Sequence, residues 1–182
     1  ALLTGLSCVV ADKEEELFDI VDDQNNVIGQ ERRSVVHAQG LKHRAVYCFV
    51  FNSRGELLLQ QRSPRKKIGP LQWDLSIAEH LEPGEEYRQA AARGLQEELG
   101  ISLVLMMLRR LDGWEGRVEA DSAEVHAWRY VSLDDIRLDM QRSPDNYTAW
   151  FRDELHVTNL SDPKIGDDRI LWNSKPIRKL NV

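Results

Sequence analysis

The chain has 182 residues, of which 42% are hydrophobic and 30% charged, proportions typical of one folded domain with a sizeable core rather than a disordered chain. The formal net charge of −6 disfavours nucleic acid as a partner, because binding phosphates needs a surplus of Lys and Arg. Two cysteines, Cys8 and Cys48, are too few for a disulfide scaffold. The longest apolar run, Leu103 to Leu108, is too short to span a bilayer, so we expect no membrane partner.

Residues 1–16 are interpreted as an N-terminal extension, and residues 17–182 as a single domain without repeats or linkers. The first ten residues are mildly apolar and lack the basic stretch of a secretory signal. A leader remnant, an artificial chain end and a first strand all stay open for them. We expect an intracellular protein of the cytoplasm, or of an organelle if these residues belong to a leader.

The next elements are mostly strands. Two short strands flank a polar turn at residues 22–26, and residues 43–62 predict a hairpin that turns at Asn52 to Gly55. A basic loop at residues 63–70 leads to a short segment over residues 72–80.

Helices become prominent further along the chain. Residues 85–99 are good helix formers that end at Gly100, the usual place for a C-terminal glycine cap. Strands over residues 101–108 and 124–132 precede a capping box at Ser132, and a last helix is expected over residues 147–155. This order predicts an α/β fold with a mixed sheet.

The predicted central helix carries a cluster of charges. Glu97 and Glu98 lie near its end, Arg93 one turn earlier, and Glu85 at its start, where the helix dipole favours a carboxylate. Clustered carboxylates provide the oxygen ligands that Mg²⁺ prefers, although a solvated acidic face would show the same composition.

The spacing of these residues resembles the Nudix box, the pattern G-x5-E-x7-R-E-U-x-E-E-x-G-U in which U is apolar. Seven of its nine defined positions match over residues 79–101. The matching residues are Glu85, Arg93, Leu95, Glu97, Glu98, Gly100 and Ile101. The resemblance implies a Nudix α/β/α sandwich and a metal-dependent diphosphatase that contains Mg²⁺ or Mn²⁺ and acts on a small-molecule diphosphate.

The same resemblance implies roles for individual residues. Glu97, Glu98, Arg93 and Glu85 form the catalytic set, in which Arg93 orients Glu85 or Glu97. The implied metal ligands are Glu97, Glu98, the Ala78 carbonyl and a downstream carboxylate. Glu124 is favoured for that last ligand, with Glu119 second. Glu119, Glu124 and Asp121 are also the candidates to substitute for the carboxylate that the pattern has at position 94 and this sequence lacks.

Two positions depart from the Nudix box. Glu79 replaces the opening Gly, and because a Glu resists positive φ, we expect a different local backbone. Gly94 replaces the first Glu of the helical trio that includes Glu97 and Glu98 on one helix face. A glycine within a helix costs about 1 kcal/mol relative to alanine. Gly94 therefore indicates either close packing or weakened hydrolysis, and in the second case a Nudix-fold binding or regulatory protein.

Further similarity lies outside the box, in the segments at residues 18–30, 37–63, 73–80 and 147–150. Together with the box, they resemble the isopentenyl-diphosphate isomerase branch of the Nudix superfamily over roughly residues 17–155. That resemblance implies an alternative metal set of His37, His43 and His80 with Glu124, which would suit Mn²⁺ or Zn²⁺. Hydrogen-bonded structural histidines remain the alternative. Isomerase activity is not expected, because Ala78 stands where that chemistry needs a cysteine.

The basic loop provides candidate contacts for the diphosphate. Arg62, Lys66 and Lys67 are interpreted as substrate-binding residues, against the alternative of a solvated loop. Trp150 matches an aromatic residue that faces substrate in the isomerase, or else anchors the last helix in the core. The sequence leaves the substrate, the metal and the oligomeric state open.

Overall fold

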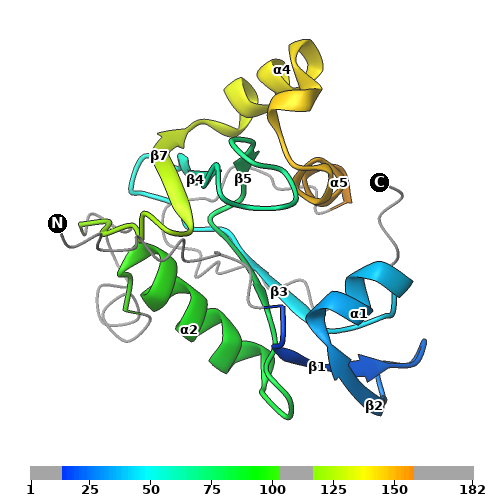
Figure 1. Ribbon diagram of the computed structural model, residues 1–182. Helices are drawn as coiled ribbons and strands as arrows, with labels where there is room; N and C mark the ends of the chain where they lie inside the picture. Colours follow the sequence, from blue (N-terminus) through cyan, green and yellow to red (C-terminus); the bar gives the residue numbers. More distant parts are fainter. Residues whose placement is uncertain (1–13, 103–116, 158–182) are drawn as a thin grey trace, which may run out of the picture.

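The computed structural model describes residues 14–102 and 117–157, which Figure 1 traces in colour. The strands are β1 (Leu17–Val21), β2 (Val27–Arg32), β3 (Ala45–Cys48), β4 (Leu57–Arg62), β5 (Trp73–Asp74), β6 (Ile77–His80) and β7 (Val125–Val131). The helical elements are α1 (Arg33–Gln39), α2 (Tyr87–Leu99), α4 (Leu133–Arg142), the short 3-10 helix η1 (Pro144–Asn146) and α5 (Ala149–Val157). In these described ranges no helix combines the length and apolar character required to cross a membrane.

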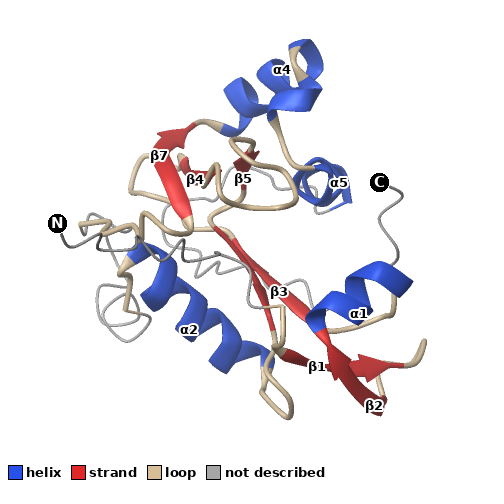
Figure 2. Cartoon of the chain, in the orientation of Figure 1, coloured by secondary structure: helices blue, strands red, loops and turns tan. Residues whose placement is uncertain are grey.

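The strands pair antiparallel: β1 with β2, β3 with β6, and β4 between β5 and β7. The chain passes from β3 to β4 through the predicted turn, where the Leu58 N–H donates to the Val50 carbonyl at 2.8 Å and Gly55 has a φ of +74°. An isolated parallel bridge joins Trp73 to Tyr147. Figure 2 shows α2 on one side of the central strands and α4 and α5 on another.

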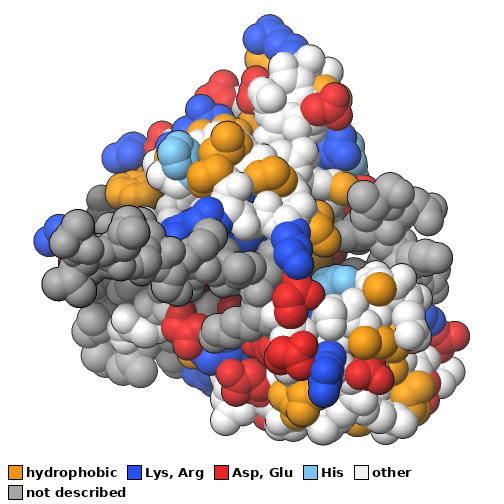
Figure 3. Space-filling view, viewed as in Figure 1, with side chains coloured by type: hydrophobic (Ala, Val, Ile, Leu, Met, Phe, Trp, Pro, Cys, Tyr) orange, Lys and Arg blue, Asp and Glu red, His pale blue; other side chains and the backbone are white. Residues whose placement is uncertain are grey.

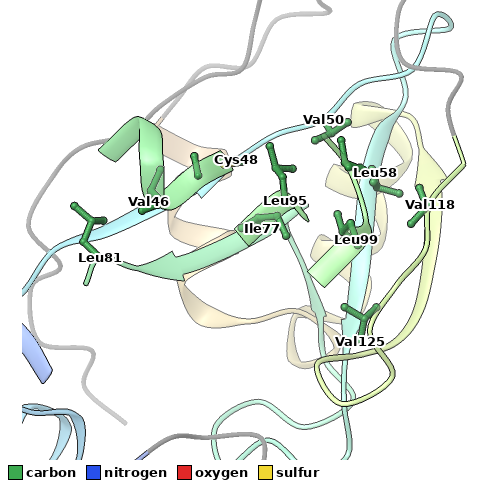
Figure 4. Packing of buried hydrophobic residues seen from close by; sticks show 13 residues of the cluster. Val46, Cys48, Val50, Leu58, Ile77, Leu81, Leu95, Leu99, Val118 and Val125 are labelled. Atoms are coloured by element: carbon green, nitrogen blue, oxygen red, sulfur yellow. The ribbon is translucent and has the colours of Figure 1, made fainter. Parts of the chain in front are cut away.

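Side chains along β3 and β4 alternate between two hydrophobic clusters, as the period of a strand requires. Val46, Cys48 and Leu58 belong to the cluster covered by α2, which Figure 4 shows. Tyr47 and Phe49 belong to the cluster formed with α4 and α5. Helices therefore cover both faces of the central strands β3, β4 and β6, and the expected α/β/α sandwich is confirmed.

The ends of α2 fix the position of its carboxylates. The helix begins after Glu86, whose backbone N–H donates to the Gln89 side chain at 3.0 Å in a reciprocal capping box. It ends at Gly100, whose φ of +66° lies in the left-handed region. The buried face of the helix consists of Ala90, Ala91, Gly94, Leu95, Glu98 and Leu99. Glu98 is thus the one carboxylate on the otherwise apolar buried face of α2.

Most of the predicted elements are confirmed, including the turn at Asn52 to Gly55, the helix that ends at Gly100 and the helix capped by Ser132, whose Oγ accepts from the Asp135 N–H at 3.2 Å. The predicted hairpin over residues 43–62 is wrong in its strand pairing: β3 pairs with β6, β4 pairs with β5 and β7, and the two arms meet beside the turn at the isolated bridge between Phe51 and Leu57. The structure adds α1, which the sequence did not predict. Glu79 lies in the extended strand β6, so its position needs no positive φ. Residues 1–13 of the expected extension, Cys8 included, and residues 103–108 of the expected strand lie outside the described residues.

Candidate functional site

Arg93 joins the start of α2 to the end of β6. Its guanidinium donates to both carboxylate oxygens of Glu85, at 3.1 and 2.9 Å, and to the His80 carbonyl at 2.9 Å. The guanidinium also lies 3.5 Å from Glu79 Oε2 and 3.8 Å from Glu97 Oε2. The hydrogen bonds to Glu85 raise the pKa of Arg93 above its ordinary value. The planar fork of the guanidinium therefore holds the strand, the loop and the helix in one arrangement.

Glu98 is the buried carboxylate of the predicted set, with 8% of its surface exposed. Gln60 on β4 donates to Glu98 Oε2 at 3.1 Å. Burial, followed by the negative charges of Glu79 and Glu124, raises the pKa of Glu98 to about 8. A bound cation would favour the charged form that burial and the neighbouring carboxylates oppose. The donor chemistry around Glu98 therefore fits a divalent cation that prefers oxygen ligands.

Glu124, rather than Glu119, is the downstream carboxylate that acts on Glu98. It forms an ion pair with Lys66, and the charges of both residues affect the pKa of Glu98. Glu119 belongs to the segment before β7 and lies beside the C-terminal end of α2, where its backbone N–H donates to the Leu99 carbonyl at 2.9 Å. Lys66 thus lies within the acidic group, where it neutralises part of the negative charge.

The remaining predicted residues are more exposed than Glu98 or make no side-chain contact with it that the described structure shows. Glu97 has 58% of its side chain exposed and lies one helical turn after Arg93 on α2. Asp121 donates its backbone N–H to the Glu98 carbonyl at 2.8 Å, and Lys67 forms an ion pair with Glu14. In Figure 3, Asp and Glu side chains gather in the lower half of the molecule with Lys and Arg among them, and this half holds α2, β1 and β2 in Figure 1.

The three histidines come together from separate elements. His37 lies on α1, His43 precedes β3, and His80 ends β6. Their ring centroids are 5.1 to 5.4 Å apart. Over residues 14–102 and 117–157, this is the only group of three or more His, Cys, Asp or Glu residues whose ligand atoms all lie within 4.8 Å of one another. The carboxylates of the predicted set do not converge as closely.

The state of the rings fits a metal ligand set. His43 Nδ1 lies 2.9 Å from the Leu41 carbonyl, while its Nε2 is buried and has no hydrogen-bond partner among the described residues. A ring that donates from Nδ1 presents a lone pair at Nε2. Burial lowers the pKa of His43 and of His80, which favours the neutral imidazole that metals bind. Phe18 stacks on His80 at a centroid distance of 4.6 Å and on His43 at 5.4 Å.

Two predicted substrate residues belong to a buried network around Asp74. Arg62 Nη1 donates to Asp74 Oδ2 at 3.2 Å, and the Trp150 indole N–H donates to the same carboxylate at 2.9 Å. The hydroxyl of Thr148 also donates to Asp74, at 3.0 Å, and the Arg62 guanidinium lies 5.0 Å from the centre of the Trp150 ring. This network attaches the start of α5 to β5, in agreement with the interpretation of Trp150 as an anchor.

The residue at the isomerase cysteine position is confined to one face of β6. Ala78 lies opposite Tyr47 in the β3–β6 pair and packs with the cluster under α4 and α5. Cys48 lies opposite Ile77 and packs in the cluster under α2. Burial raises the pKa of Cys48 to about 12. Cys48 is thus an inert core thiol on the other face of the sheet.

Three residues at these sites were missed by sequence reasoning. Gln60 holds Glu98, Asp74 holds Arg62 and Trp150, and Phe18 covers the histidines. Only Gln60 had a usable signal, because a glutamine that directly follows three leucines in a strand is a buried polar residue that needs a partner.

Comparison with known proteins identifies the family of this chain. The family model described as "NUDIX domain" matches residues 41–151, more than half of the chain. An isopentenyl-diphosphate Delta-isomerase of Serratia proteamaculans is 31% identical over 157 residues, which cover 75% of this chain and 88% of that protein. An uncharacterized Nudix hydrolase of Nostoc sp. is 39% identical over 127 residues, or 69% of this chain and 72% of that protein.

The fold has a counterpart among solved structures. The crystal structure of DR0079 from Deinococcus radiodurans matches with a TM-score of 0.66 and 19% identity, covering 78% of this chain and 98% of that chain. At this identity the likeness concerns the fold. The extent of the domain match and the identity to the curated relatives show the family itself: this chain belongs to the Nudix family.

Proposed function

We propose that the protein is a metal-dependent Nudix hydrolase that cleaves the diphosphate linkage of a nucleoside diphosphate derivative or another small organic diphosphate. The observation that carries this proposal is the buried carboxylate Glu98, held by Gln60 and surrounded by further negative charge at the end of α2. Such a group suits Mg²⁺ or Mn²⁺. A divalent cation bound there would neutralise charge that develops on the diphosphate and lower the pKa of an attacking water.

The chain's own residues would position the reacting groups. Arg93 restrains Glu85 and the His80 carbonyl, so that the loop before α2 keeps its geometry when substrate binds. Gln60 directs the Glu98 carboxylate by hydrogen bonding to one of its oxygens. On substrate binding, Lys66 would leave its ion pair with Glu124 and bind a phosphate oxygen, because its flexible side chain allows the ammonium to change partners.

The histidine group supports a second metal site of the kind implied by the isomerase resemblance. His43 Nε2, with the rings of His37 and His80 beside it, would hold Mn²⁺ or Zn²⁺. Several relatives are named isopentenyl-diphosphate Delta-isomerases, yet Ala78 provides no thiol for that reaction. We therefore infer hydrolysis rather than isomerisation, and expect no conversion of isopentenyl diphosphate to dimethylallyl diphosphate.

The test is a screen for phosphate release over nucleoside diphosphate derivatives and isoprenyl diphosphates, with Mg²⁺ and Mn²⁺ compared. We expect metal-dependent release from at least one class, and loss of at least about 100-fold in rate in Glu98→Gln, because removal of a positioned catalytic carboxylate typically has that effect. Glu82→Gln, which removes a nearby exposed charge, is the matched control.

Two results would contradict the proposal. The first is an unchanged rate in well-folded Glu98→Gln. The second is tight binding of diphosphates by the wild-type protein without any release, which would identify a Nudix-fold binding protein instead.

A further inference from the structure

The two departures from the Nudix box meet in the structure. A Cβ atom placed on Gly94 would lie 3.2 Å from Glu79 Cβ and 3.3 Å from Glu79 Cγ. It would also lie 2.9 Å from Ile77 Cγ2, closer than Cβ atoms approach other carbon atoms in proteins. The side chains of Ile77 and Glu79 therefore both lie over the bare backbone of Gly94, in the space that a side chain at position 94 would need.

The Glu79 carboxylate also belongs to the same electrostatic group as the helical carboxylates. Its Oε2 lies 3.5 Å from the Arg93 guanidinium, which is also 3.8 Å from Glu97. One guanidinium thus contacts the carboxylates of both Glu79 on β6 and Glu97 on α2. The carboxylate of Glu79 therefore lies on the side of β6 that faces the helical carboxylates.

We propose that Glu79 supplies, from strand β6, the carboxylate that the Nudix box otherwise takes from helix position 94. The Gly-to-Glu change at position 79 and the Glu-to-Gly change at position 94 are then one exchange, in which the carboxylate moves from the helix to the strand and the small residue moves from the strand to the helix. A side chain at position 94 would start 3.2 Å from Glu79 Cβ, so the two positions start a side chain from nearly the same point between β6 and α2. The inference rests on the proposed metal site and specifies one of its ligands.

The experiment measures Mn²⁺ binding rather than turnover. All proteins carry His37→Ala, so that the histidine group does not contribute, and free Mn²⁺ is followed by electron paramagnetic resonance. We expect Glu79→Gln to raise the Kd for Mn²⁺ at least tenfold, whereas Glu82→Gln changes it less than twofold. The double variant Glu79→Gly/Gly94→Glu should bind within about threefold of the parent. The increase in unfolding temperature caused by Mn²⁺ should follow the same order.

The outcomes separate this inference from the proposed function. If Glu79→Gln binds Mn²⁺ like the parent while Glu98→Gln does not, the metal site stands and the role of Glu79 is refuted. If the parent protein, which carries His37→Ala alone, binds no Mn²⁺, then both the proposed carboxylate metal site and the role of Glu79 are refuted. If Glu79→Gly/Gly94→Glu folds, judged by unfolding in EDTA, but binds no better than Glu79→Gln, the two positions are not equivalent and the exchange is refuted.

Discussion

Gly94→Ala tests whether close packing explains the glycine in α2. From helix propensity alone, the substitution should stabilise the protein by about 1 kcal/mol. The structure predicts the opposite sign, because the new methyl group would lie 2.9 Å from Ile77 Cγ2 and 3.2 Å from Glu79 Cβ. Both neighbours belong to β6, so relief would require the helix and the strand to separate.

The magnitude follows from how little Ile77 can move. Ile77 is fully buried, and its branched Cβ restricts χ1, so its methyl group cannot turn away at low cost. Overpacking of this kind typically costs about 1–3 kcal/mol, which exceeds the gain in propensity. We expect a net loss of about 1 kcal/mol, equivalent to a fall of about 0.5 M in the urea midpoint if the m-value is about 2 kcal/mol/M.

A comparison on the same helix isolates the propensity term. Gln96 is exposed, so Gln96→Ala should be more stable than Gln96→Gly by about 1 kcal/mol. Urea unfolding of all three variants gives both signs under one set of conditions. If Gly94→Ala raises the midpoint as the exposed pair predicts, the packing explanation is refuted, and the exchange between positions 79 and 94 loses its steric basis.

Three further predictions concern other parts of the protein. Arg93→Lys should lower the free energy of unfolding by about 1–3 kcal/mol in urea titration, because an ammonium cannot reproduce the paired bonds to Glu85; equal stability would contradict this. In the Cys8→Ser variant, Cys48 should not react with iodoacetamide at pH 8 until the chain unfolds, because the thiol is buried and burial raises its pKa to about 12. Labelling of the folded protein, detected by mass spectrometry, would contradict this. His43→Gln should raise the Kd for Zn²⁺ at least tenfold in calorimetry, through loss of the free Nε2; an equal effect of the exposed-site control His126→Gln would argue against the histidine site.

The elements that the sequence predicted have strong local signals. The turn at Asn52 to Gly55 closes because Asn52 Oδ1 accepts from the N–H groups of Arg54 and Glu56, each at 3.0 Å. Gly100 ends α2 and Ser132 begins α4 through interactions within one helical turn. Such interactions depend on residues a few positions apart, so sequence inspection can find them.

The parts that the sequence did not predict depend on contacts between distant residues. Helix α1 has seven residues and no side-chain cap at its start, and a helix of this length is not stable alone. The buried side chain of Val36 attaches it to the rest of the protein. In the same way, Glu79 and Gly94 are separate anomalies in the sequence, and only the packing of β6 on α2 relates them.

The alternation of side chains along β6 relates the two candidate metal sites. Ile77 and Glu79 face α2 and Gly94, while Ala78 belongs to the cluster on the other face and His80 lies with the other histidines. One four-residue strand thus separates a carboxylate side from an imidazole side. The missing thiol, at Ala78, affects the imidazole side that resembles the isomerase, whereas the Glu79–Gly94 exchange keeps a carboxylate on the other. The changes on the two faces therefore have opposite consequences, and together they favour hydrolysis at the carboxylates over isomerisation.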